Sequence, residues 1–208
     1  MTRNPAAAGA LGGLAGSLLG SVLTGGKVKA GGLLKAGGLA TIGYLAYQAW
    51  QRHQAQKAGL AVTEPERRPA AASAPAALPE AFDLLATSHA TQALQVVRAM
   101  VAAAKADGVV DAAEQTRIAE RVRTAGLSSE EQAQVLKLLT EPLNIDAVVS
   151  GVESPELASE IYAASLLAVH PANRAERAYL DMLAARLQLD PGLVAELERG
   201  VAAAAAPA

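Results

Sequence analysis

The chain has 208 residues, 18 basic and 20 acidic side chains, and no cysteine. Its apolar fraction of 51% includes 50 alanines, and only 3% of its residues are aromatic. This length suits one compact domain with appendages. The absence of cysteine from the sequence excludes disulfide scaffolds, thiolate metal sites and cysteine nucleophiles.

Charge is divided unequally along the chain. Residues 1–60 contain six basic side chains and no Asp or Glu, whereas residues 61–208 contain 12 basic and 20 acidic ones. A basic, acid-free head on an acidic body predicts that the head alone meets a membrane surface or an anionic partner. The acidic body argues against nucleic-acid binding, because phosphates attract positive charge.

Residues 1–57 form a head rich in glycine, alanine and apolar residues. Charged residues are missing over the 22 positions of 5–26 and over the 15 positions of 36–50. A spanning helix needs about 20 apolar residues, and aromatic side chains such as those near residue 50 favour the lipid interface. These features predict lipid contact through residues 5–50. The alternative is a low-complexity leader without membrane contact.

Glycines recur at intervals of four in the first of these stretches, at Gly12, Gly16 and Gly20. In lipid the backbone must satisfy its own hydrogen bonds, so the segment is expected to be helical despite its glycines. Small residues at this spacing allow another helix to approach closely. The pattern therefore predicts that the head self-associates in a membrane.

A linker and a helical body follow the head. Proline occurs four times in residues 58–79, which predicts an extended, semi-rigid spacer. Residues 80–200 show helical apolar spacing and helix-start signals, without strand-like alternation. We expect six or seven helices packed closely through alanine as a compact all-α bundle. Residues 201–208 are expected to be a disordered tail.

An acidic turn is predicted after the first helix of the body. Asp107, Asp111 and Glu114 flank Gly108, which allows a sharp turn, and carboxylates in such turns bind Ca²⁺ or Mg²⁺. Asp111 and Glu114 also have the spacing of a capping box, and the spacing alone favours this purely structural role over a cation site. A similar turn recurs 62 residues later, with Glu176 in the place of Glu114. The repeat predicts a pseudo-duplicated bundle.

The run MVAAAKADG at residues 100–108, followed by Asp111 and Glu114, resembles the tellurite-resistance TerB-like domain. Segments 141–143, 160–162 and 176–180 support this resemblance, which covers about residues 90–200. The order of apolar head, Pro/Ala linker and helical body resembles the uncharacterised YebE-like inner-membrane family.

These resemblances imply an all-helical domain attached to the bacterial inner (cytoplasmic) membrane, with the helical domain in the cytoplasm. They also imply a divalent-cation site with Asp107, Asp111, Glu114 and Glu176 as ligands. His170 departs from the pattern, because related sequences tend to carry an acid there. No enzymatic activity is implied.

The sequence thus predicts a membrane-anchored, non-enzymatic binding or scaffold module with a divalent cation and an unidentified protein partner. One alternative is a soluble helical protein whose head docks onto another protein. A second is a metal-dependent hydrolase, in which the carboxylates would hold an ion with an open coordination position. The body lacks the histidine-rich ligand set, phosphate-binding glycine loop and nucleophile–base pair that would favour an enzyme.

Overall fold

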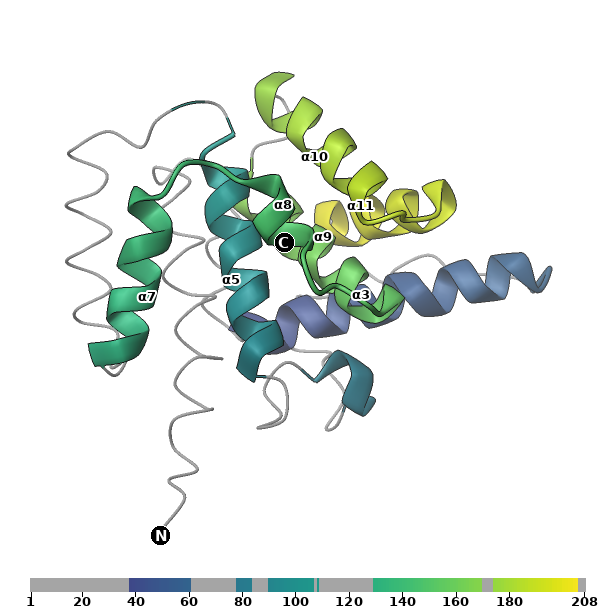
Figure 1. Ribbon diagram of the computed structural model, residues 1–208. Helices are drawn as coiled ribbons and strands as arrows, with labels where there is room; N and C mark the ends of the chain where they lie inside the picture. The colour runs from purple at the N-terminus through teal and green to yellow at the C-terminus, as the bar shows by residue number, and fades with distance from the viewer. Residues whose placement is uncertain are drawn as a thin grey trace, which may run out of the picture.

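The computed structural model describes residues 38–60, 78–83, 90–106, 108, 129–169 and 174–205 (Figure 1). Within these ranges the chain forms seven α-helices and one short 3-10 helix, and no strand. The prediction of an all-α bundle is therefore confirmed. The elements are α3 (Gly38–Lys57), η1 (Glu80–Phe82), α5 (Ala90–Ala104), α7 (Ser129–Thr140), α8 (Ile145–Val149), α9 (Pro155–Ala168), α10 (Arg174–Arg186) and α11 (Pro191–Ala205).

Helix α9 is the central element of the bundle. All of its residues from Leu157 to Ala168 are buried. A helix that is buried on every side needs partners all round, and α9 packs against α3, α5, α10, α11 and η1. In Figure 1, α3 is blue to purple and α5 is teal, whereas α10 and α11 are yellow-green to yellow; all four lie around α9.

Side-chain caps begin two of the helices for which the sequence contains start signals. The Ser154 Oγ atom accepts a hydrogen bond of 3.1 Å from the amide of Leu157, and Pro155 follows at the first helical position. The Asn144 side chain caps α8 in the same way, with a 3.1 Å bond from the amide of Ala147. Each cap satisfies an amide that has no partner within its helix.

Alanine supplies much of the core, as expected. Fully buried alanines lie on α3, α5 and α9, where their small side chains let the helix backbones approach closely. They are Ala46, Ala49, Ala99, Ala103, Ala163 and Ala164.

The structure corrects the expected boundary between head and body. Residues 38–57, assigned above to the membrane-associating head, form α3, which packs against α9 and α11 in the bundle (Figure 1). Ile42 and Leu45 are buried in the common core. An uncharged apolar face suits a protein core as well as it suits lipid, and here α9 and α11 supply the apolar partner. Within the described ranges, none of the helices has the length and hydrophobicity needed to span a bilayer.

The aromatic side chains expected at a lipid interface also belong to the bundle. Tyr44 is buried, and Trp50 packs partly buried against the core. The ring of Tyr47 lies against that of Phe82 in η1, with ring centroids 5.3 Å apart. These contacts account for the aromatic residues of α3 as part of the bundle core.

The expected tail is shorter than predicted. Helix α11 extends to Ala205, so residues 201–205 are helical instead of disordered. Val201 is 9% exposed and belongs to the core, and the alanines after it favour helix. Residues 1–37 and 61–77, which contain most of the predicted head and linker, lie outside the described residues.

Candidate functional site

The four predicted metal ligands are divided between the described and the undescribed parts of the chain. Asp107, Asp111 and Glu114 lie outside the described residues. Glu176 lies in the first turn of α10 and is 8% exposed. Among the described side chains, no three His, Cys, Asp or Glu residues are placed to hold a metal ion. The cation site therefore stays a prediction.

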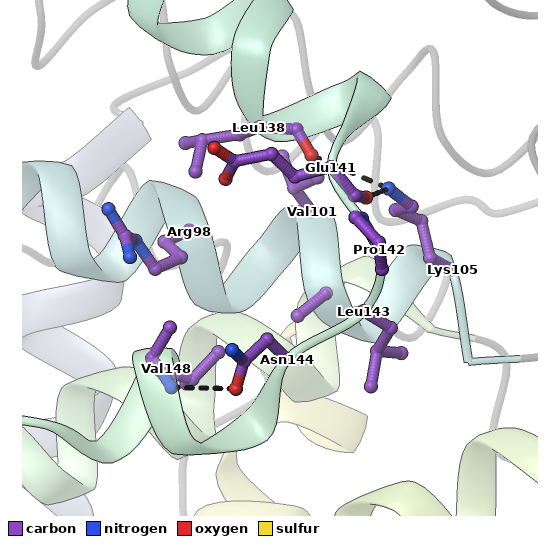
Figure 2. A pocket seen from close by; sticks show the side chains of 11 residues that line it. Arg98, Val101, Lys105, Leu138, Glu141, Pro142, Leu143, Asn144 and Val148 are labelled. Atoms are coloured by element: carbon purple, nitrogen blue, oxygen red, sulfur yellow. Dashed lines mark hydrogen bonds between the residues drawn. The ribbon is translucent and has the colours of Figure 1, made fainter.

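The turn that leads into the acidic motif is held by Lys105. Its ammonium group donates hydrogen bonds to three backbone carbonyls at the end of α7, those of Leu139 (2.9 Å), Leu138 (3.4 Å) and Glu141 (Figure 2). A cation is favourable there because the last carbonyls of a helix lack partners and carry partial negative charge. Burial lowers the pKa of Lys105, and the nearby Glu141 carboxylate opposes that shift.

Gly108 has the conformation that the sequence predicts. Its φ angle is +151°, in the region that side-chain-bearing residues rarely adopt. Helix α5 ends at Ala104, and the amide of Gly108 donates a 3.3 Å hydrogen bond to the carbonyl of Lys105. Lys105 thus fixes the start of the acidic turn against α7.

A hollow lies between α5, α7 and α8 next to this lysine (Figure 2). Its volume is about 30 Å³, the space of about one water molecule. Arg98, Lys105 and Glu141 supply its charged lining. A hollow of this size does not fit an organic substrate.

The most unusual group in the described structure is the carboxyl of Glu160 on α9. The residue is 1% exposed, and its Oε1 atom has no hydrogen-bond partner. Burial raises the pKa of Glu160 to about 8, with further contributions from the Glu156 and Asp83 carboxylates. A buried carboxyl near two like charges favours the neutral form, so Glu160 carries a proton at neutral pH.

Glu160 lies beneath a close crossing of α3 and η1. A Cβ atom added to Gly43 of α3 would lie 3.3 Å from Glu160 Oε1 and 2.2 Å from the carbonyl oxygen of Phe82. The same position is 3.3 Å from the Leu78 side chain. Only glycine leaves room for this approach. The crossing thus places residues 78–83 directly over the buried carboxyl.

A second buried acid, Glu196, joins α11 to α3. It is fully buried, and its Oε1 atom accepts hydrogen bonds from Gln56 (2.5 Å) and from Arg199. At the end of the same interface, the Asp190 carboxylate lies 3.6 Å from the Lys57 ammonium and 3.8 Å from the His53 ring. This carboxylate also accepts from the amide of Gly192, and that bond is the main reason why its pKa is lowered.

A third polar cluster ties α9 and α10 to α11. The Tyr162 hydroxyl donates a hydrogen bond of 3.1 Å to Glu198, and the Arg177 guanidinium lies 3.0 Å from the same carboxylate. Burial, followed by the Glu198 charge, raises the pKa of Tyr162, so its hydroxyl keeps its proton. The charged groups in these two clusters have partners, which indicates a structural role. Glu160 Oε1 and Glu196 Oε2 are both buried without a hydrogen-bond partner among the described residues. Glu196 Oε1, however, accepts from Gln56 and Arg199, whereas the charged groups that act on Glu160 are both acids.

The comparisons with known proteins add one match. A family model described as "Protein of unknown function (DUF533)" matches residues 6–201. The match thus includes the apolar N-terminal segment as well as the bundle. No curated protein and no solved structure matches the chain.

Proposed function

We propose that this chain, which belongs to the DUF533 family of proteins of unknown function, is a non-enzymatic helical binding or scaffold module. Its N-terminal segment would attach it to a membrane. One observation carries this proposal. The bundle includes residues 38–57 as α3, and an uncharged stretch of 22 residues, 5–26, precedes it; all of this stretch from residue 6 lies in the family match. That length meets the requirement of about 20 residues for a spanning helix.

The proposed lipid contact is therefore narrower than the sequence alone predicts. It comprises residues 5–26 instead of 5–50, because residues 41–46 are buried in the bundle. Lys27, Lys29 and Lys35 lie between the uncharged stretch and α3. Basic residues beside a membrane segment are attracted to anionic headgroups. Gly12, Gly16 and Gly20 would then support association between two such segments.

The binding role and its location rest on resemblance. The likeness of residues 90–200 to the TerB-like domain supports a divalent-cation site at Asp107, Asp111, Glu114 and Glu176. The way in which Lys105 anchors the acidic turn favours such a site, because it fixes where the turn begins. The likeness of the whole chain to the YebE-like family supports the inner membrane, with the bundle in the cytoplasm.

Fractionation of native membranes tests the attachment. We expect the full-length chain to stay in the pellet after a carbonate wash, and Leu18→Glu with Leu19→Glu to move it to the supernatant. A charged residue at the centre of a spanning helix costs about 2.5–3.5 kcal/mol on insertion scales. Met182→Glu is the matched control, because Met182 lies on α10 and is 44% exposed; this variant should stay in the pellet. Release of the wild-type chain by carbonate would favour a soluble protein whose head docks onto another protein.

A further inference from the structure

We infer that Glu160 is a proton-binding residue that couples pH to the docking of residues 78–83 on the bundle. The inference stands on the geometry of the crossing. The Glu160 carboxyl, the Phe82 carbonyl and the Leu78 side chain all lie within 3.3 Å of the position that a Cβ atom on Gly43 of α3 would take. The inference about Glu160 does not depend on membrane attachment.

The junction accepts a neutral carboxyl much better than an ionised one. Among the described residues, none donates a hydrogen bond to Glu160 Oε1 that would stabilise a negative charge. The Phe82 carbonyl oxygen presents further partial negative charge at the same crossing. Glu156, one turn earlier on α9, and Asp83, just after η1, are the charged groups that act on it, and both are acids. Loss of the proton would therefore leave a buried charge without compensation.

Charged groups on the other elements packed against α9 do not offset this charge. The described side chains of α3 beside Gly43, residues 41–46, contain no acid or base except the Tyr44 phenol. The ionisable residue of α5 is Arg98, which lines the hollow near α7 and α8. On α10 and α11, Arg177 pairs with Glu198, and Arg199 pairs with Glu196. No basic side chain of the described chain lowers the pKa of Glu160.

Of the parts that meet at this junction, the segment 78–83 can move away from the bundle most easily. It contacts α3 and α9, and Phe82 is its one buried side chain, whereas Pro79, Glu80 and Ala81 are exposed. Helix α9 is enclosed by the whole bundle. Displacement of the segment would admit water to the ionised carboxyl at a smaller cost than opening the core. Opening would return the Glu160 pKa from about 8 towards its ordinary value of 4.5, so opening releases a proton between these two values. The segment should therefore open increasingly often as the pH rises from about 4.5 to about 8, and its opening should level off above that pH.

Hydrogen exchange of the full-length chain tests the coupling directly. The amides of Phe82 and Asp83 donate to the carbonyls of Pro79 (2.9 Å) and Glu80 (3.0 Å), so they report on this segment. After correction for the intrinsic exchange rate, we expect their protection in the wild type to fall about 100-fold between pH 6 and pH 9, because the opening equilibrium changes about tenfold per pH unit until the pKa near 8 is reached. Glu160→Gln should keep the same protection at both pH values. Glu156→Gln, a control on the same helix, should still lose protection.

Two results would overturn the inference: wild-type protection that does not change with pH, or an equal loss in Glu160→Gln. A titration of the Glu160 carboxyl carbon by NMR provides a test that needs no variant. A midpoint near 8 supports the coupling, whereas a midpoint near the ordinary value of 4.5 would refute it even if Glu160→Gln failed to fold.

Discussion

Gly43→Ala is expected to lower the free energy of unfolding by about 2–3 kcal/mol, the upper range for an overpacked core. The added Cβ atom would lie 2.2 Å from the backbone oxygen of Phe82, which is closer than real contacts allow. A flexible side chain could rotate away, but a backbone carbonyl cannot. Either η1 must leave α3, or α3 must shift against α9. Urea unfolding followed by circular dichroism measures the loss.

Gly200→Ala is the matched control for this prediction. Gly200 also lies inside a helix, α11, but a Cβ atom there would meet only the Arg52 guanidinium, at 4.0 Å. In a helix interior with free space, alanine stabilises by up to about 1 kcal/mol relative to glycine. The two alanine substitutions should therefore act in opposite directions. Equal effects at the two positions would contradict the close crossing at Gly43.

Ile161→Ala is expected to be more severe and to destabilise the bundle by about 4 kcal/mol, within the known range of 2–5 kcal/mol. Ile161 is fully buried on α9, the helix that packs against α3, α5, α10, α11 and η1. Buried alanines such as Ala163 and Ala164 are common around it. Alanine has no flexible side chain that could move into the cavity, so the cavity should persist.

Thermal or urea unfolding of Ile161→Ala beside Met182→Ala would measure this cost. Met182 lies on the exposed side of α10, and its truncation should change the free energy of unfolding by no more than about 0.5 kcal/mol. A loss below about 1 kcal/mol in Ile161→Ala would mean that α9 is not enclosed as described.

The starts of helices could be predicted because their signals are local. Asn144, Ser154 and Asp190 each cap an amide two or three residues ahead, so the stretch of sequence around them contains the information. The place of α3 could not be predicted in this way. Its uncharged face fits lipid and protein equally well, and the contacts that decide between them come from distant residues. The Gln56–Glu196 hydrogen bond, for example, joins positions 140 residues apart.

The buried carboxyl was missed, although the sequence contains a signal for it. A glutamate within a helix is usually expected to face solvent. Between Leu157 and Ala168, however, Glu160 is the one charged residue, and the rest of that stretch is apolar or small. A helix with apolar residues on all sides must be buried all round, and its single acid is buried with it. Lys105 offers no such signal, because its partners on α7 lie more than 30 positions away.

The central claim is that residues 38–57 are an integral helix of the bundle, and Ala46→Asp tests it most directly. Ala46 is fully buried on α3, and a carboxylate there would be an unpaired charge in the core. Urea unfolding of the full-length chain should show a loss of at least about 3 kcal/mol for Ala46→Asp. Gln54→Asp, on the exposed face of the same helix, should stay within about 0.5 kcal/mol of the wild type. If both variants unfold at the same urea concentration as the wild type, α3 lies outside the bundle and the account is wrong.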